Sequence, residues 1–236
     1  NNSVRTNYKK LINWFKNQEK NELRKKSSDA RKFFQNTGVS FKVYSNDDKE
    51  NLIPFDIIPR IINSKEWEKM VKGITQRVLA INFFLNDIYG EQEIIKHGVM
   101  PIDIIQNNPA FLKQMVGFTP PKKTYNHISG IDLIKTNSDN FYVLEDNVRV
   151  PSGASYMIEN RDTMIKLFPD LISRYKVFEN RNYANNLSEI LKKSSPKKAN
   201  RNPNIVLLTP GIYNSAFFEH AFLADKLLSL IHISEP

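Results

Sequence analysis

Two carboxylates and one amide in the middle of the chain could together hold a divalent metal ion. Asp132, Glu145 and Asn147 carry hard oxygen atoms, which are the ligands that magnesium prefers in proteins. Glu145 and Asn147 are two residues apart, so on a β-strand their side chains point to the same face. Asp132 can join them only if it reaches that face from a neighbouring strand.

The pairing of the two segments follows from the turn formers between them. A four-residue loop at 137–140 would pair Thr136 with Phe141 and therefore Asp132 with Glu145, which brings the oxygen atoms within about 5–8 Å of one another. A register slip of one residue would turn Asp132 to the opposite face. The alternative interpretation is a polar strand end that runs into a turn.

The residues that follow offer a candidate cradle for an anion. Ser152, Gly153 and Ser155 precede a helix that begins near Tyr156, and Arg149 adds a fixed positive charge. Backbone N–H groups at a helix N-terminus favour phosphate groups. The segment is not a Walker loop, because no Gly-Lys-Ser/Thr follows. An ordinary Pro-Ser-Gly turn that caps a helix would contain the same residues, so both interpretations stay open.

The composition excludes several other kinds of site. The 236 residues contain no Cys, which excludes a disulfide framework, a thiolate metal site and a Cys nucleophile. The His residues do not show zinc-ligand spacing, and no Gly-x-Ser-x-Gly motif supports a serine hydrolase. No apolar run approaches the roughly 18 residues of a membrane span. We therefore expect a cytoplasmic protein with a buried core and no membrane contact.

The net charge of +9 is concentrated in two segments. Residues 1–32 contribute +7 and residues 192–201 contribute +5, so the rest of the chain carries −3. Charge confined to a terminal helix and a loop is typical of a solvated surface. Arginine, which favours bidentate phosphate contacts, supplies only 10 of the 34 cations. We therefore expect no nucleic-acid partner.

Both helices and strands are expected to position these residues. Ser64 is the expected N-cap of a long helix whose apolar positions should face the core. A strand, the turn Pro210-Gly211 and a capped helix predict the opening of a parallel α/β unit. The hydrophobic pattern predicts helices over residues 8–35, 64–89, 91–97, 101–107, 109–115, 155–167, 186–193 and 214–229, and strands over 39–44, 125–135, 141–147 and 204–209, with 52–59 as an extended edge segment.

Four motifs resemble those of the circularly permuted ATP-grasp proteins of bacteria (type 2), which are relatives of the synthetase domain of glutathionylspermidine synthetase. The resemblance covers about residues 36–228. The motifs are Phe55-Asp-Ile-Ile-Pro-Arg-Ile-Ile62, Gly130-Ile-Asp-Leu133, Tyr142-Val-Leu-Glu-Asp-Asn-Val-Arg-Val-Pro-Ser-Gly153 with Ser155-Tyr-Met-Ile-Glu-Asn-Arg161, and Leu208-Thr-Pro-Gly-Ile-Tyr-Asn-Ser-Ala-Phe-Phe-Glu-His-Ala-Phe-Leu223.

The resemblance implies a mixed α/β fold, an incomplete circularly permuted ATP-grasp domain. It would contain N-terminal helices, a central antiparallel hairpin and the start of a parallel βα unit. We expect the chain to be an N-terminal fragment, because the lysines and lid that hold the nucleotide in this family would lie beyond residue 236. The expected segments are an N-terminal helix (1–35), the N-terminal part of the ATP-grasp domain (36–191), a linker (192–203), the first βα unit of a truncated subdomain (204–228) and a non-native tail (229–236).

The activity that the resemblance implies is ATP- and magnesium-dependent ligation of a carboxylate to an amine through an acyl phosphate. The substrates would be small molecules or peptides, and the fragment alone is expected to be inactive. A non-catalytic scaffold or binding protein with the same fold is the alternative. The family has an Arg two residues before its metal-binding Asp, where this chain has Gly130. The implied roles are metal ligation by Asp132, Glu145 and Asn147, nucleotide binding by Ser152, Gly153 and Ser155, and catalysis by the cation Arg149.

Overall fold

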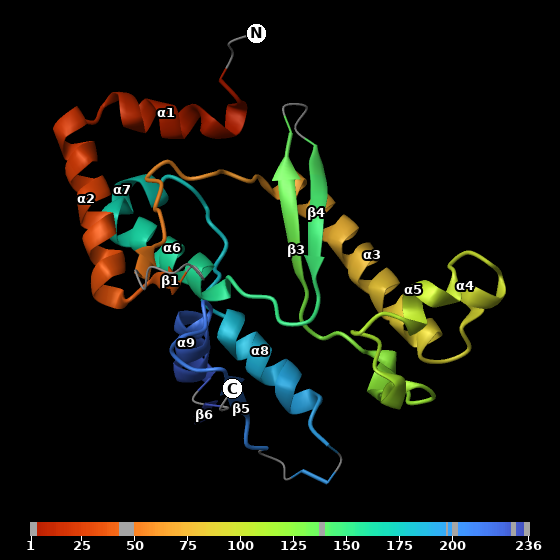
Figure 1. Ribbon diagram of the computed structural model, residues 1–236. Helices are drawn as coiled ribbons and strands as arrows, with labels where there is room; N and C mark the ends of the chain where they lie inside the picture. The colour runs from red at the N-terminus through yellow and green to blue at the C-terminus, as the bar shows by residue number, and fades with distance from the viewer. Residues whose placement is uncertain are drawn as a thin grey trace. The chain divides into compact units, whose positions relative to one another are not determined.

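The structure is a computed structural model of the chain, and it describes residues 4–42, 50–136, 140–196, 198–199, 203–227 and 230–233. The chain forms two compact units, one of residues 1–62 and 152–236 and one of residues 63–151 (Figure 1). These units cut across the segments expected from the sequence. Among the helices of the described residues, none has the length and apolar character needed to span a membrane.

The first unit begins with two helices where the sequence predicted one. A short 3-10 turn, η1 (Thr6–Tyr8), leads into α1 (Lys9–Lys16), and residues 17–19 separate α1 from α2 (Lys20–Thr37). The side-chain amide of Asn17 donates to the Asn13 carbonyl at 3.0 Å, and that of Gln18 donates to the Trp14 carbonyl at 3.4 Å. These side-chain amides occupy backbone carbonyls of the last turn of α1 in place of further backbone N–H groups, and α1 ends there. The expected stop at Gly38 is confirmed, because its φ of 68° is left-handed.

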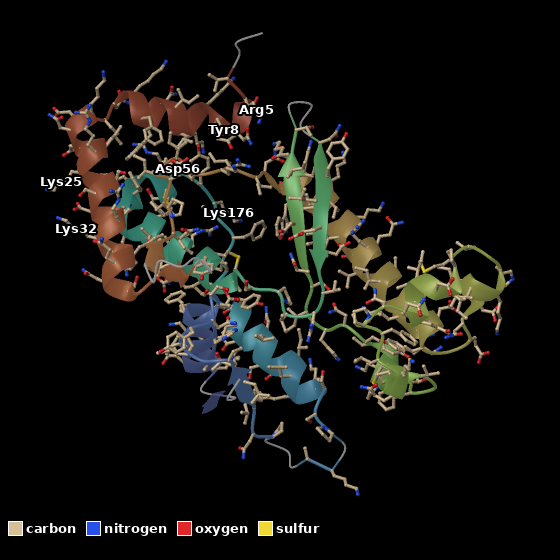
Figure 2. All side chains as sticks on the ribbon, viewed as in Figure 1. Arg5, Tyr8, Lys25, Lys32, Asp56 and Lys176 are labelled. Atoms are coloured by element: carbon tan, nitrogen blue, oxygen red, sulfur yellow. The ribbon has the colours of Figure 1, made fainter. Side chains whose placement is uncertain are left out.

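The core of this unit joins α1 to α6 (Ala154–Leu167) and α7 (Pro169–Ile172). Trp14 packs edge-on against Phe168, with ring centroids 5.5 Å apart. Lys26 lies over the Phe168 ring and donates to the Leu167 carbonyl at 2.6 Å, whereas Lys25 and Lys32 on α2 are exposed (Figure 2). The buried residues of this cluster are Leu11, Trp14, Met164, Phe168 and Leu171.

The parallel unit expected near the C-terminal end of the sequence is present. β5 (Val206–Thr209) pairs in parallel with β6 (Leu230–Ile233), and α9 (Phe217–Leu227) connects them. Residues 230–233, where we expected a non-native tail, thus form a strand of this unit. β5 is less buried than expected, since Leu208 is 71% exposed. The other elements of the unit are α8 (Tyr183–Lys193) and the antiparallel pair β1 (Ser40–Lys42) and β2 (Glu50–Leu52).

The second unit is built on the long helix α3 (Ser64–Ile88). Its N-cap is Asn63 and not Ser64, because Asn63 and Glu66 form a reciprocal capping box. The expectation of a continuous core-facing stripe is also wrong, since Trp67 and Val71 are exposed. The remaining elements are α4 (Glu93–Lys96), α5 (Ile102–Gln106), η2 (Lys113–Met115), η3 (Pro121–Lys123), β3 (Gly130–Lys135) and β4 (Phe141–Asn147).

Candidate functional site

The hairpin β3–β4 pairs Asp132 with Glu145, as the sequence predicted, but by a different route. At the turn end Lys135 pairs with Phe141, which is one residue out of the expected register. The register shifts between Leu133 and Asp132, which restores the expected pairing at the other end of the hairpin. Residues 137–139 of the expected loop lie outside the described residues.

The register shift is a β-bulge in which Leu144 is the extra residue. Leu133 pairs with Val143 and Asp132 pairs with Glu145, so Leu144 has no partner opposite it, and its side chain is 67% exposed. An extra residue reverses the alternation of faces along β4. Without the bulge, Glu145 would share the face of Val143, opposite to that of Asp132.

Helix α3 fixes which face is which (Figure 1). Lys135 forms an ion pair with Glu66 at 2.6 Å, and Asp146 forms two hydrogen bonds of 2.6 Å with the Arg77 guanidinium. Both partners lie on α3, so Lys135 and Asp146 face this helix. Hydrogen bonding to Arg77 holds the pKa of the Asp146 carboxyl below its usual value. Asp146 is thus occupied by a structural partner.

The opposite face of the hairpin carries the three predicted ligands. Asp132, Glu145 and Asn147 are all exposed, and the Asn147 amide donates to Glu145 Oε1 at 3.0 Å. In the part of the chain that the structure describes, no three Asp, Glu, His or Cys side chains gather closely enough to form a metal site by themselves. Two carboxylates and one amide fit magnesium only when other oxygen atoms complete its shell, as phosphates and water do for this ion.

The start of β3 is tightly packed against the segment that follows β4. Gly130 pairs with Asn147. A Cβ atom on Gly130 would lie 2.7 Å from the Pro151 Cβ and 3.5 Å from the Asn147 Cβ. The chain therefore has no room for a side chain at this position without a shift of Pro151, and the glycine holds the two strand ends close together.

A side-chain amide also ties the two ends of the hairpin together. The Asn126 amide donates to the carbonyls of Ile128, at 3.1 Å, and of Val148. Its backbone N–H donates to the side-chain oxygen Oδ1 of Asn82 on α3 at 3.0 Å. The residues before β3 and after β4 are thereby fixed to one another and to α3. No pattern in the sequence predicted this arrangement.

Arg149 follows the ligands by two residues and is exposed. Among the described residues, no group forms a hydrogen bond or ion pair with its guanidinium. Its guanidinium is available to an anion. Arg149 itself lies outside β4, which ends at Asn147.

The predicted anion cradle lies in the other compact unit, and an internal anion fills it. The backbone N–H groups of Gly153, Ala154 and Ser155 donate to the Glu219 carboxylate at 2.7, 3.3 and 3.2 Å, and the Ser155 hydroxyl donates to it at 2.6 Å. The sequence predicted an anion cradle of Ser152, Gly153 and Ser155, and Gly153 and Ser155 donate here to an internal carboxylate. It did not identify Glu219 as their partner. Ser152 makes no contact with this carboxylate among the described hydrogen bonds.

Three other polar residues of the quoted motifs make contacts within the protein. Asp56 accepts a hydrogen bond from the Ile58 N–H at 2.8 Å, and Asn214 accepts one from the Ala216 N–H at 2.9 Å. His220 is paired with Thr209 at 2.7 Å. The first two contacts are those of turns, and the third joins α9 to the end of β5.

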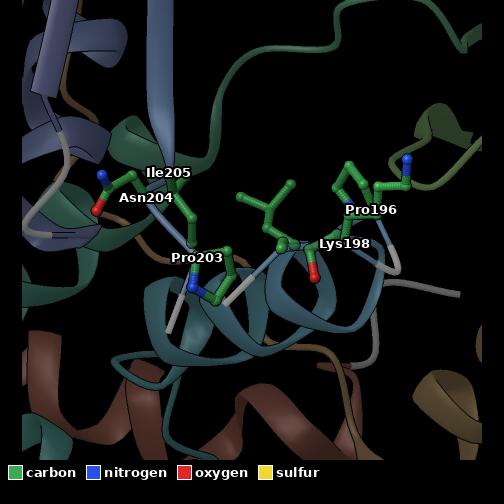
Figure 3. Close-up of a pocket in the computed structure, with 8 residues that line it drawn as sticks. Pro196, Lys198, Pro203, Asn204 and Ile205 are labelled. Atoms are coloured by element: carbon green, nitrogen blue, oxygen red, sulfur yellow. The ribbon is translucent and has the colours of Figure 1, made fainter. Parts of the chain in front are cut away.

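An open hollow of about 550 Å³ lies beside the C-terminal end of α8 (Figure 3). The expected linker lines most of it, and it contains none of the predicted site residues. Its lining residues are Leu191, Ser195, Pro196, Lys198, Ala199, Pro203, Asn204 and Ile205.

Comparison with known proteins gives a consistent result. Residues 59–233 match the family model described as a circularly permuted ATPgrasp. An uncharacterized protein of Synechocystis sp. is 43% identical over 92% of this chain and 45% of its own length, and one of Mycobacterium tuberculosis is 39% identical over 95% and 40%. A protein of Frankia casuarinae with the provisional name glutamate–cysteine ligase 2-2 is 34% identical over 80% of this chain and 22% of its own. The chain spans less than half the length of these curated relatives.

Proposed function

The chain belongs to the circularly permuted ATP-grasp family, and from this membership we propose that the whole protein is an ATP- and magnesium-dependent ligase. It would join a carboxylate to an amine. The ligase name carried by the Frankia relative supports this class of reaction. The substrates would be small molecules or peptides, each with a free carboxylate or a free amine.

The observation that carries this proposal is the pairing of Asp132 with Glu145, with Asn147 beside them on one exposed face. These side chains would hold Mg²⁺ through their oxygen atoms. The Asn147 amide, which donates to Glu145, would keep that carboxylate in one orientation. When bound, ATP would transfer its γ-phosphoryl group to the substrate carboxylate with ADP as the leaving group, which gives an acyl phosphate, and magnesium would neutralise the phosphate charge.

The residues of this chain would contribute position and charge rather than a nucleophile. The bulge at Leu144 keeps Glu145 and Asn147 on the face of Asp132, and the ion pair of Asp146 with Arg77 holds that face away from α3. Arg149 would add positive charge near the transferred phosphoryl group, where fixed charges lower the barrier most effectively. The substrate amine would then displace phosphate from the activated carboxylate.

Glu145→Gln in the whole protein tests this assignment. The substitution keeps the shape of the side chain and one oxygen ligand, but removes the negative charge. Loss of one electrostatic contact to a transition state typically lowers kcat by about 10²–10³. We expect this loss in magnesium-dependent ADP release, measured with mixtures of candidate carboxylates and amines. The melting temperature should change little, because Glu145 is exposed.

Asp146→Asn is the matched control, because the two carboxylates are adjacent in sequence and point to opposite faces. This substitution weakens the ion pair with Arg77 and should leave ADP release within a few-fold of the unsubstituted protein. Equal losses from both substitutions would show that the face assignment does not define a metal site. A protein that binds Mg-ATP but releases no ADP with any substrate pair would be a non-catalytic binding protein.

A further inference from the structure

The N-terminus of α6 has no cap from its own residues. Gly153 occupies the cap position with a φ of 117°, and the first turn of the helix contains no acidic residue. The carboxylate of Glu219 takes this place from the first turn of α9, 64 residues away from Ser155. The side chain of a distant residue thus caps the N-terminus of α6, as a local Asp or Ser does at other helices.

Both oxygen atoms of this carboxylate are used. Glu219 Oε2 accepts from the N–H groups of Gly153 and Ser155 and from the Ser155 hydroxyl, and Oε1 accepts from the N–H of Ala154. Glu219 is only 3% exposed, and Ser155 is fully buried. Charge-assisted hydrogen bonds of this kind are stronger than neutral ones, and they are stronger still when water is excluded.

An external anion would compete with Glu219 for the same donors. It would also be repelled by the buried negative charge of Glu219, and this repulsion is strong because water screens little of it at a buried position. Burial raises the pKa of Tyr156 and of Tyr183, and the Glu219 charge raises both further.

The next residue of α9 anchors a different turn. The His220 ring is hydrogen-bonded to the Thr209 hydroxyl at 2.7 Å, and the Thr209 oxygen accepts from the Gly211 N–H at 3.2 Å. Phe218 stacks on Tyr156, with ring centroids 5.7 Å apart. The start of α9 is therefore held in place by contacts that do not involve Glu219.

We propose that Glu219 is the permanent anion of the Gly153–Ser155 turn, a positioning residue that fixes this turn and keeps phosphate groups out of it. The turn comes shortly after Asn147 and Arg149 along the chain. The consequence for catalysis rests on the proposed function, whereas the competition between Glu219 and external anions does not.

Glu219→Ala in the whole protein tests the inference by chemical rescue. The substitution leaves three N–H groups and a hydroxyl without their acceptor, and we expect the melting temperature to fall by roughly 5–10 °C. Sodium acetate or sodium phosphate should recover part of this loss by filling the vacated position. Sodium chloride at the same ionic strength should not, and the unsubstituted protein should gain nothing from acetate beyond its response to chloride.

Glu189→Ala is the control, because Glu189 is an exposed carboxylate of the same unit that only approaches Lys192 at 3.5 Å. It should show neither the loss nor the rescue. If Glu219→Ala does not fold, Glu219→Gln and a phosphate titration of the unsubstituted protein decide the question. Phosphate-induced shifts of the Gly153–Ser155 amide signals in the unsubstituted protein would overturn the proposal, and so would a Glu219→Ala variant that acetate stabilises no more than chloride does.

Amide hydrogen exchange separates positioning from general stability. Exchange at residues 153–155 should accelerate in Glu219→Gln more than exchange elsewhere in the unit, and an even acceleration throughout would contradict the proposal. In the ADP-release assay, Glu219→Asp should retain more of kcat than Glu219→Gln does, with KM for ATP changed less than kcat. If the unsubstituted protein releases no ADP, the proposed function fails while the rescue and exchange results still decide the role of Glu219.

Discussion

Gly130→Ala should be destabilising, although alanine is normally the better residue in a strand than glycine. The new Cβ would lie 2.7 Å from the Pro151 Cβ, whereas carbon atoms in contact are usually about 3.5–4.0 Å apart. Pro151 must therefore move by roughly 1 Å. Overpacking of this size costs about 1–3 kcal/mol, and the lower entropy of the unfolded chain returns about 0.4–1 kcal/mol. We expect a net loss of about 0.5–2 kcal/mol.

A double-mutant cycle measures this contact directly. Pro151→Gly removes the atom that the new Cβ would meet, so Gly130→Ala should cost much less in that background, with a coupling of about 1 kcal/mol. Pro151→Ala retains the Cβ and should not give the same relief. The free energy of unfolding of each variant, from urea titrations, provides the four corners of the cycle.

The same substitution should also affect the proposed metal site. Gly130 is the cross-strand partner of Asn147, so a shift that relieves the 2.7 Å contact with Pro151 would also disturb the strand end that carries this ligand. Magnesium-dependent ADP release should therefore fall in Gly130→Ala and recover partly in the double variant. Full stability of Gly130→Ala, or an equal cost with and without Pro151→Gly, would refute the steric argument.

Two further predictions concern the first compact unit. Burial lowers the pKa of His220, and the Glu219 charge opposes this shift, so the unfolded chain takes up a proton at a higher pH than the folded chain does. Stability should therefore rise with pH through the window that ends near the ordinary His pKa of about 6.5. In thermal melts recorded across this window, His220→Asn should flatten the rise. Trp14→Ala should lower the free energy of unfolding, measured in urea, by about 3–5 kcal/mol, because the ring is buried against Phe168. Trp67 is exposed, so Trp67→Ala should cost far less. Similar costs would contradict the packing described for Trp14.

The sequence was sufficient for features that depend on neighbouring residues. The turn formers around 137–140 and the alternating residues on either side predicted the hairpin. The predicted Asp132–Glu145 pair forms only because the bulge at Leu144 offsets a register that is one residue out at the turn end. Gly38 predicted the end of a helix. Such signals are local because a turn or a helix end is stabilised by residues within a few positions of it.

Other features required contacts between distant segments. The bulge at Leu144 is visible only in the observed pairing of β3 with β4. The contacts of Glu66 and Arg77 on α3 then identify the face of Lys135 and Asp146. The split between α1 and α2 depends on side-chain amides that compete for helix carbonyls.

The Gly153–Ser155 turn shows the difference most clearly. Its residues indicated a group of donors for an anion, and the structure contains these donors. A sequence lists donors and acceptors without stating which of them meet, and Glu219 is one acidic residue among 25. Only the packing of α9 against α6 selects it, because a buried hydrogen-bonding group must be satisfied by whatever acceptor the tertiary structure brings to it.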